Sequence, residues 1–375
     1  MHLKSIVFAA FLLFLFQSIS IGDEFTTVNA EGWPEGEALF RQDNRWLGAD
    51  GAMSYRLNKN SVLWLFGDTF VAKKPGADRK NAAFVRNTIG IQHGLNPAEA
   101  KMKFYWKTAE GYPSSYFSED GEVWFWPGGV TRVKDRLFIF LMAIRPTKGD
   151  VFGFGFEAFE TRVILVDNPD DNPSEWNLNE VISLKNDIGV VVGSSSLVIE
   201  DDFVYAFGSK EDKNHDIYLV RWNINDFYNA DLSTSHWWCG DKVGFASINH
   251  NSPQPVIQKG QTEFTVHYCP HTKQYLQAQG IGFGVVPLAL RQAETLTGPW
   301  TEPIEVFQPE EKGRKELLLY AVKSHPELSG ADLVLSYVTN STNADVVYKD
   351  NTVYYPRLVR INFSASSRES EQQRE

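Results

Sequence analysis

A pattern of two apolar runs joined by a polar turn recurs five times along the 375-residue chain, and this repeat constrains the fold more than any other feature. Each copy starts with small or polar residues, continues as an apolar run, turns, and returns as a second apolar run. The predicted turns are at residues 58–61, 134–135, 201, 260 and 329–330. They are about 60 to 75 residues apart, a longer period than the ~40 to 45 residues of a WD40 blade.

A second pair of strand candidates follows each hairpin, because runs rich in Val, Ile, Phe, Tyr and Trp are typical of β-strands. Examples are "NTIGIQHG" with "KFYWKTA", "TRVILVDN", "DIYLVRWNI", "GVVPLALRQAE" and "YYPRLVRINF". The strands "VLWLFG" and "RLFIFLM" are apolar at nearly every position, as burial of both strand faces requires. The chain is therefore predicted to be all-β, a five-bladed β-propeller with four-stranded blades. A pair of β-sandwiches would show similar strand spacing, but the five hairpins follow one another without an obvious linker.

Residues 1–20 have the layout of a secretory signal peptide: a weakly positive start, an apolar run over 6–16, and small residues before a cleavage point after Ser20. The apolar run is shorter than the roughly 20 residues that span a bilayer. We therefore expect a secreted protein, extracellular or periplasmic, with the propeller domain at 21–364. The polar residues 365–375 are expected to form a disordered tail.

The composition excludes several kinds of partner. The chain contains 47 Asp and Glu against 36 Lys and Arg, a net charge of −11. This balance argues against binding to nucleic acid or to an anionic membrane through bulk charge. No other long apolar run follows the first twenty residues, so membrane insertion is not expected. We expect a monomer that acts on a neutral or weakly charged substrate.

Only two cysteines, Cys239 and Cys269, are present, which is too few for a disulfide scaffold or a four-ligand zinc site. In an exported protein they could form one disulfide. The sequence leaves this pairing open, because it does not show whether the two Cβ atoms meet.

Two aspartates stand at the ends of the first hairpin, "GADGAMSYRLNKNSVLWLFGDTF". Folding this hairpin about the centre of its turn places residue 50 opposite 69, so Asp50 and Asp68 emerge at the same open end of adjacent strands. Adjacent strands lie about 4.8 Å apart, which would place the carboxyl groups roughly 5 to 9 Å apart, within the range that glycosidases use. The alternative is that both aspartates only cap turns through hydrogen bonds to the backbone.

Other side chains are predicted to reach the same end of the strands. Aromatic faces on which a sugar ring could stack are candidates for substrate binding, as are donors and acceptors for sugar hydroxyls. The candidates are Tyr55, Trp126 and Tyr320 among the aromatic residues, and Arg86, Asn87, His250, Asn251, Lys323 and His325 among the polar ones. Each of them could instead be structural, because buried polar groups also need partners.

The first hairpin, together with "RNTIGI", "FWPGG", "VYAFG", "GPWTEP" and "YAVKSHPEL", resembles the family known as domain of unknown function 4185. The similarity runs over nearly the whole mature chain, although only the first motif is specific. The resemblance implies a five-bladed propeller related in architecture to the furanosidases and fructosidases of glycoside hydrolase families 43 and 32. Some members of the family are secreted endo-acting arabinofuranosidases that cleave D-arabinan, and Asp50 and Asp68 match its paired aspartates.

One departure from related propeller glycosidases concerns the general acid, which they usually take from the inner rim of a later blade. The third hairpin here begins "GSSS" and the fourth "NSPQP", so neither rim position holds a carboxylate. Either Asp50 and Asp68 perform all the acid and base chemistry, or Glu122 contributes, or the site has lost hydrolysis.

These observations predict a secreted glycoside hydrolase acting on a polysaccharide or oligosaccharide, with arabinofuranosidic linkages as the expected substrate and Asp50 and Asp68 as the catalytic pair. No cofactor and no catalytic metal are expected, and a structural calcium ion held by one of the two aspartates is an alternative. The competing function is a noncatalytic carbohydrate-binding or surface-interaction propeller in which the aspartates are structural.

Overall fold

The computed structural model describes residues 28–148, 155–184 and 186–363 of the chain. The predicted signal peptide at 1–20 and the predicted tail at 365–375 lie outside the described residues. Within these described ranges, no helix combines the length and the apolar character needed to cross a membrane.

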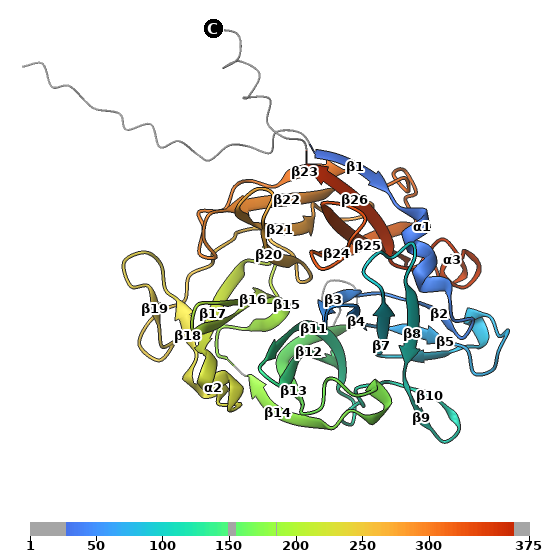
Figure 1. Ribbon diagram of the computed structural model, residues 1–375, viewed down its shortest axis with the longest axis horizontal. Helices are drawn as coiled ribbons and strands as arrows, with labels where there is room; N and C mark the ends of the chain where they lie inside the picture. The colour runs from blue at the N-terminus through green and yellow to red at the C-terminus, as the bar shows by residue number, and fades with distance from the viewer. Residues whose placement is uncertain (1–27, 149–154, 185, 364–375) are drawn as a thin grey trace, which may run out of the picture.

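Five antiparallel sheets of four or five strands are arranged around a common centre (Figure 1). Sheet I consists of β3 (Met53–Arg56), β4 (Ser61–Phe66), β7 (Thr88–His93) and β8 (Lys101–Tyr105). Sheet II consists of β11 (Trp124–Val133), β12 (Arg136–Pro146), β13 (Phe156–Val166) and β14 (Leu178–Leu184). Sheet III consists of β15 (Val190–Glu200), β16 (Phe203–Lys210), β17 (Ile217–Asn223), β18 (His236–Trp238) and β19 (Phe245–Ala246).

The last two sheets complete the arrangement. Sheet IV consists of β20 (Thr265–Cys269), β21 (Gln274–Gly280), β22 (Leu288–Ala293) and β23 (Ile304–Phe307). Sheet V consists of β24 (Leu317–Ser324), β25 (Leu333–Ser341), β26 (Arg357–Phe363) and β1 (Val28–Gly32). Because β1 pairs with β26, the two ends of the described chain meet in one sheet.

Two smaller sheets and short helices connect these units. The smaller sheets are β2 (Trp46–Ala49) with β5 (Thr69–Val71) and β6 (Ala83–Val85), and β9 (Lys107–Ala109) with β10 (Tyr112–Ser114). The α-helices are α1 (Pro34–Glu37), α2 (Ile224–Tyr228) and α3 (Ala344–Lys349). The 3₁₀ turns are η1 (Ala38–Arg41), η2 (Arg79–Asn81), η3 (Pro173–Glu175) and η4 (Leu232–Thr234). The predicted all-β class is confirmed.

Strand β4 shows why the inner strands are apolar at every position. Successive side chains of a strand point to opposite faces of its sheet. Val62, Trp64 and Phe66 therefore pack against sheet V, whereas Leu63 and Leu65 pack against sheet II. A strand with neighbours on both faces cannot alternate apolar and polar residues without burying unpaired polar groups.

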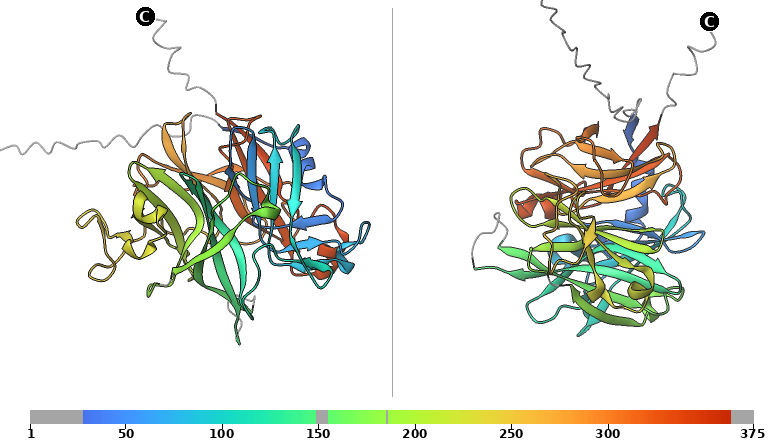
Figure 2. Two further views of the ribbon diagram at one scale, coloured as in Figure 1. Left: turned by 60° about the horizontal axis from the view of Figure 1, so that its bottom comes forward. Right: turned by 90° about the vertical axis from the view of Figure 1, so that its left-hand side faces the viewer.

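The same double packing extends around the molecule. Five clusters of buried apolar side chains lie between sheets V and I, I and II, II and III, III and IV, and IV and V. Neighbouring sheets thus pack face to face, as the views in Figure 2 show. Cys239 and Cys269 belong to different clusters, between sheets II and III and between sheets IV and V, and both thiols are free. The disulfide that the sequence left open is therefore absent.

Four of the five predicted hairpins are correct, and the fourth is wrong. The segment from residue 251 to 264 forms only a single bridge, between Ile257 and Ile217. Pro253 and Pro255 interrupt this segment, because proline has no N–H to donate to a strand partner. The actual fourth hairpin joins β20 to β21 and turns between Cys269 and Gln274.

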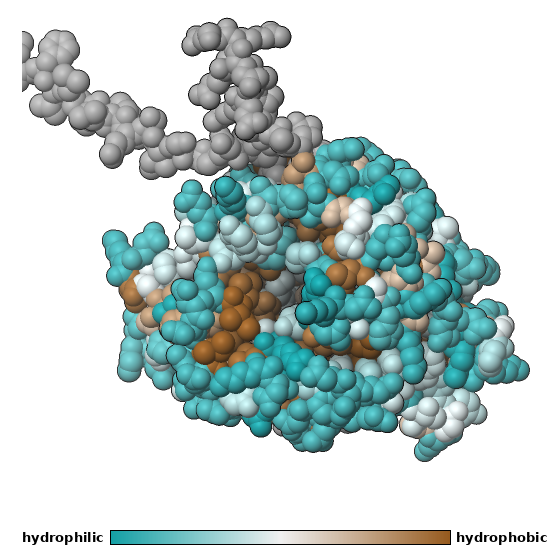
Figure 3. All heavy atoms as spheres, viewed as in Figure 1, coloured by the Kyte–Doolittle hydropathy of each residue, from teal (hydrophilic) through white to brown (hydrophobic). Residues whose placement is uncertain are grey.

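The surface on the side viewed in Figure 1 is mainly hydrophilic around a central hollow, and hydrophobic residues gather at part of its margin (Figure 3). Asp50 and Asp68 lie at the end of the first hairpin that is away from its turn.

Candidate active site

Asp50 and Asp68 face each other directly across two paired strands. Ala49 of β2 pairs with Thr69 of β5, and the N–H of Asp50 donates to the carbonyl oxygen of Asp68 over 3.3 Å. The N–H of Gly67 donates to the carbonyl oxygen of Asp50 over 3.0 Å. The register differs by one residue from the predicted one, which had placed residue 50 opposite 69. The correction places the two aspartates directly opposite each other.

Two glycines make this close approach sterically accessible. Gly51 has φ +82°, and a Cβ atom there would lie 2.9 Å from the nitrogen of Gly67. A Cβ atom on Gly67 would lie 2.4 Å from Oδ1 of Asp50. The glycines in "ADG" and "FGD" therefore create the space in which the Asp50 carboxyl lies, since any other residue would add a Cβ atom there.

The Asp50 carboxyl is surrounded by hydroxyl groups and other acids. Its Oδ2 accepts hydrogen bonds from the hydroxyls of Tyr320, over 2.7 Å, and Tyr354, over 3.3 Å. Burial raises the pKa of Asp50 well above its usual value, the nearby charges of Asp68 and Glu263 raise it further, and the two tyrosine hydrogen bonds oppose the rise. Asp50 is thus the group that retains a proton.

The Asp68 carboxyl is held by a cation and an indole. Its Oδ1 accepts from Nε1 of Trp126 over 3.0 Å, and its Oδ2 is 3.3 Å from Nη1 of Arg86. The Arg86 guanidinium stacks over the ring of Trp124, 4.4 Å from its centroid. Burial raises the pKa of Asp68 to about 6, and Arg86 and the Trp126 hydrogen bond limit the rise. Near neutral pH, Asp68 is therefore the ionised member of the pair.

Two glutamates that the sequence interpretation missed reach the same cavity. Glu263 directly precedes Phe264 and strand β20, and its Oε1 is 2.6 Å from Nζ of the buried Lys323. It was missed because the fourth hairpin was placed too early, with its turn at Gly260, so that "QTEF" was assigned to the turn end of the second strand, away from the rim. With the correct hairpin, Glu263 stands at the rim where the sequence interpretation found no carboxylate.

Glu211 follows strand β16 and is held by neutral donors. It accepts hydrogen bonds from Ser209 over 2.5 Å and from Thr262 over 2.9 Å, and His215 lies 4.0 Å away. Burial raises the pKa of Glu211, the serine and threonine hydrogen bonds and His215 oppose the rise, and the charge of Glu263 adds to it. The acidic end of "GSKED" after the third hairpin was the available signal for this residue.

Both aspartates and both glutamates line one cavity of about 720 Å³. The polar lining is completed by Glu157, His215, Gln261, Thr262, Tyr320, Asn340 and Tyr354. Its apolar lining includes Phe70, Phe84, Trp126, Met142, Ile144, Phe156, Phe283, Val286, Leu318, Leu319, Val322 and Val347. Among the described residues that line this cavity there is no lysine or arginine. Apolar walls with a few convergent polar groups are typical of small-molecule and sugar sites.

The sequence motifs can now be compared with known families. A family model described as a domain of unknown function (DUF5005) matches residues 35–363. The chain belongs to this family. The suggested membership of the domain of unknown function 4185 family was wrong. No curated protein matches the sequence.

Solved structures resemble this DUF5005 chain at low sequence identity. A Bacteroides ovatus crystal structure, provisionally described as a hydrolase, has a TM-score of 0.70 and 17% identity over 95% of each chain. This likeness shows a shared fold. Weaker matches are an exo-β-1,3-galactanase from Phanerochaete chrysosporium (TM-score 0.48, 12% identity, 84% of this chain and 63% of that one) and the catalytic domain of a Coprinopsis cinerea α-L-arabinofuranosidase (TM-score 0.46, 12% identity, 86% and 94%). Because both scores are below 0.5, neither supports an inference about the DUF5005 chain.

Four of the predicted substrate-binding residues belong to the site. Trp126 and Tyr320 line the cavity and hydrogen-bond to the aspartates. Arg86 forms an ion pair with Asp68. Lys323 does not line the cavity, but it holds Glu263 in place from the protein interior. Its role is therefore to position a carboxylate.

Three other candidates are structural in this fold. The hydroxyl of Tyr55 accepts from the backbone N–H of Arg132 over 2.9 Å, between sheets I and II. The buried side chain of Asn87 donates to the carbonyl oxygens of Phe117 and Phe125. None of these contacts reaches the cavity. They satisfy backbone groups that packing has removed from water.

His325 is also structural. It is fully buried, with Nδ1 bonded to the hydroxyl of Ser54 and Nε2 2.8 Å from the hydroxyl of Ser336. Burial and the charge of Lys323 lower the pKa of His325 to about 3. A neutral imidazole between two hydroxyls links sheets I and V.

The remaining candidates lie away from the cavity. His250 is exposed and Asn251 donates to the carbonyl oxygen of Ser247, in the loop that follows β19. Both had been placed at a strand end by the incorrect fourth hairpin. Glu122 is exposed in the turn before β11 and does not line the cavity.

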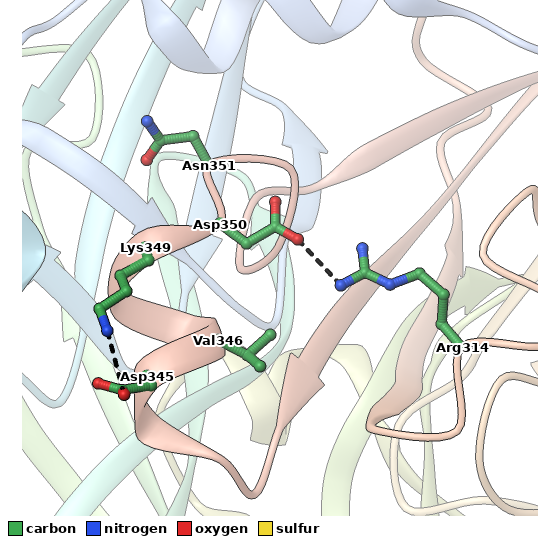
Figure 4. A pocket seen from close by; sticks show the side chains of 6 residues that line it. All are labelled: Arg314, Asp345, Val346, Lys349, Asp350 and Asn351. Carbon is green, nitrogen blue, oxygen red and sulfur yellow. Dashed lines mark hydrogen bonds and ion pairs between the residues drawn. The ribbon is translucent and has the colours of Figure 1, made fainter.

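No cluster of three or more His, Cys, Asp or Glu side chains suited to a metal ion occurs in the described parts of the chain. A second depression on the surface, beside α3, is lined by Arg314, Asp345, Val346, Lys349, Asp350 and Asn351 (Figure 4). Arg314 pairs with Asp350 and Lys349 with Asp345, so these charges satisfy one another.

Proposed function

We propose that this protein is a glycoside hydrolase built on a five-bladed β-propeller with four-stranded blades. The observation that carries the proposal is the pair Asp50 and Asp68, placed opposite each other in one cavity but in unequal environments. Hydrolysis of a glycosidic bond needs one carboxylic acid that protonates the leaving oxygen and one carboxylate that attacks the anomeric carbon or activates the attacking water. The five packed sheets support the propeller, and their shared fold with a provisionally assigned hydrolase is consistent with it.

In the proposed mechanism Asp50 is the general acid and Asp68 the nucleophile. Asp50 and Asp68 oppose each other beside the paired strands β2 and β5, and the charge of Asp68 raises the pKa of Asp50, so the two carboxyls act within one site. We propose the retaining scheme for this pair, in which the second carboxylate attacks the anomeric carbon directly. A bond forms between an Asp68 oxygen and the anomeric carbon while the bond to the leaving oxygen breaks and takes the proton of Asp50. Water then hydrolyses the ester, with the ionised Asp50 as base, and the anomeric configuration is retained.

The glutamates have supporting roles in this scheme. The charge of Glu263 helps to keep Asp50 protonated, and Lys323 fixes the position of that charge. Glu211 provides a second protonatable carboxyl group in the cavity. We assign the acid to Asp50, because it lies opposite Asp68 whereas Glu211 comes from sheet III.

For the substrate we propose a polysaccharide, with arabinofuranosidic linkages as the first class to test, and for the location we propose secretion. Secretion rests on residues 1–20. Arabinans are tested beside galactans and xylans as neutral polysaccharides. The cavity supports a neutral sugar, because its described lining holds five acids, no lysine or arginine, and one histidine that lies beside Glu211.

The test is hydrolysis of a panel of arabinans, galactans and xylans, read as release of reducing ends. Wild type should cleave at least one, and the NMR spectrum of the first product should show retained configuration. Asp50→Asn and Asp68→Asn should each lower the rate about 10²–10⁴-fold, whereas Glu211→Gln should keep most activity. Binding of a glycan without cleavage would contradict the proposal and support the noncatalytic alternative. Loss of activity in Glu211→Gln but not in Asp50→Asn would transfer the acid role to Glu211.

A further inference from the structure

Two exposed phenylalanines stand out at the cavity. Among the described residues only seven large apolar side chains are strongly exposed, and the two phenylalanines in this group, Phe84 and Phe283, both line the cavity. Phe283 is 82% exposed and Phe84 is 48% exposed. Exposing an aromatic ring gives no stability to the fold, so rings gathered at a polar cavity indicate a ligand that covers them.

Phe283 is presented by an anchored loop between β21 and β22. It stands between Gly282, with φ +101°, and Gly284, with φ +94°. The carbonyl oxygen of Gly284 accepts from the N–H of Leu319 over 2.8 Å, and the N–H of Ile281 donates to Pro287 across the base of the loop over 3.1 Å. The loop is therefore fixed to β24 immediately before Tyr320. This places the exposed ring near the network that holds Asp50.

Phe84 is connected to the other aspartate. It lies on β6 and packs against Phe70, with ring centroids 4.8 Å apart. The guanidinium of Arg86, which pairs with Asp68, lies 5.6 Å from the centroid of the Phe84 ring. Phe84 thus lies beside the cation that binds Asp68, and Phe283 lies on a loop bonded to the residue before Tyr320. Both rings line the cavity that contains the two aspartates.

The charges of the cavity restrict what can cover these rings. The five lining carboxylates are Asp50, Asp68, Glu157, Glu211 and Glu263. Among the described lining residues there is no lysine or arginine, and His215 lies beside Glu211, so the cavity is dominated by acids and would repel a chain of uronic acids or sulfated sugars. The C–H face of a neutral sugar ring is apolar and packs on the face of an aromatic ring.

We infer that Phe283 and Phe84 are stacking subsites for a neutral polysaccharide chain that continues beyond the cleaved bond on both sides. Phe283 contacts a sugar on the leaving-group side, next to Asp50, and Phe84 contacts one on the side of Asp68. This inference rests on the proposed function for the position of the bond. It adds the class of substrate and predicts cleavage within a chain rather than removal of a terminal sugar.

All proteins in the titration carry Asp68→Asn as a common background, so that affinity is measured without hydrolysis, and wild type here means the protein with its natural aromatic residues. Full-length wild type, Phe283→Ala, Phe84→Ala and Phe283→Trp are titrated calorimetrically with arabinan, galactan and xylan oligosaccharides of two to eight sugars, and with oligogalacturonate as the acidic probe. Tyr268→Ala is the matched control, because Tyr268 is 49% exposed but does not line the cavity. Circular dichroism checks that each variant is folded.

Affinity of wild type should increase with the number of sugars and should be absent for oligogalacturonate. Phe283→Ala should weaken binding of the longer oligosaccharides about 10-fold, which is about 1.4 kcal/mol, while Phe283→Trp and Tyr268→Ala should bind like wild type. Unchanged affinity in both alanine variants, equal affinity for oligogalacturonate, or no binding of any neutral oligosaccharide would overturn the inference. If the alanine variants lose affinity as expected but the protein with Asp68 intact cleaves no glycan, the stacking subsites are supported and the proposed hydrolase activity is refuted.

Discussion

The two halves of the carboxylate pair differ in what surrounds them. Asp50 receives hydrogen bonds from Tyr320 and Tyr354 and is close to the charge of Glu263, whereas Asp68 is bound by the cation of Arg86 and the indole N–H of Trp126. Both carboxyls are removed from water, so burial alone would raise both pKa values. The partners therefore decide which oxygen keeps the proton.

The difference shows that two identical residues at the ends of one hairpin can have different pKa values, as an acid and a base require. The hairpin places the carboxyls opposite each other and makes them equivalent by local structure. The asymmetry comes from sheet V on one side and from sheet II and the strands β6 and β7 on the other. Each prediction below changes one side and leaves the other intact.

The largest effect is expected from removing each carboxylate and following the rate against pH. Activity of wild type should rise as the pH passes about 6, where Asp68 ionises, and fall again at the higher pKa of Asp50. Asp68→Asn should lower the rate about 10²–10⁴-fold and remove the acidic limb from the residual profile. Asp50→Asn should lower it comparably and remove the alkaline limb. Identical residual profiles in the two variants would show that the aspartates do not divide the roles.

A smaller effect is expected from removing the cation beside Asp68. Arg86→Met should raise the pKa of Asp68, because the guanidinium stabilises the ionised form. The acidic limb of kcat/KM should therefore move to higher pH, and the alkaline limb should stay in place. Glu122→Gln, an exposed residue outside the cavity, is the control. If the acidic limb stays at the wild-type pH, Arg86 does not lower the pKa of Asp68.

Neutralising the acid beside Asp50 should affect the opposite limb. Glu263→Gln removes a negative charge that raises the pKa of Asp50, so Asp50 should lose its proton at lower pH. The alkaline limb should move to lower pH by less than the Arg86 variant moves the acidic one, because Glu263 acts on Asp50 through its charge alone, whereas Arg86 both pairs with Asp68 and hydrogen-bonds to it. Movement of the acidic limb instead would mean that Glu263 acts on Asp68.

The smallest effect concerns stability. Asp50 has a raised pKa in the folded protein. Its contribution to the free energy of unfolding is therefore fully present below the unfolded pKa of about 3.9 and is lost as the pH rises through the folded pKa. Asp50→Asn cannot ionise and keeps the tyrosine hydrogen bonds. The melting temperature of Asp50→Asn, relative to that of wild type, should therefore increase steadily from pH 4 to pH 9. A constant difference across this range would show that Asp50 titrates normally.

Much of the site was predictable where local sequence controls geometry. The paired aspartates follow from hairpin folding, and Trp126 and Tyr320 follow from their positions in inner hairpins. The one-residue error in register arose in the turn, which is centred on Lys59 and not between Lys59 and Asn60, because Arg56 pairs with Val62 and Ala49 pairs with Thr69 in one continuous register. No pattern of apolar residues fixes the centre of a polar turn to one residue.

The polar candidates near strand ends fall into two groups in the structure. Asn87 and His325 satisfy buried backbone and hydroxyl groups, and Arg86 and Lys323 satisfy carboxylates. The sequence presents the same residue types in both cases. Because the fourth hairpin was misplaced, Glu263 was missed, and His250 and Asn251 were proposed in its place.

By itself the sequence determined the all-β class, the strands buried on both faces and the opposition of Asp50 and Asp68, because these depend on the two-residue period of a strand and on turns a few residues long. The tertiary structure decided which aspartate is protonated, which glutamates join the cavity and which aromatic rings remain exposed. Those properties depend on burial and on contacts between sheets far apart in the chain. Tyr320 and Asp50 are separated by 270 residues, yet their hydrogen bond exists only because sheets V and I pack together.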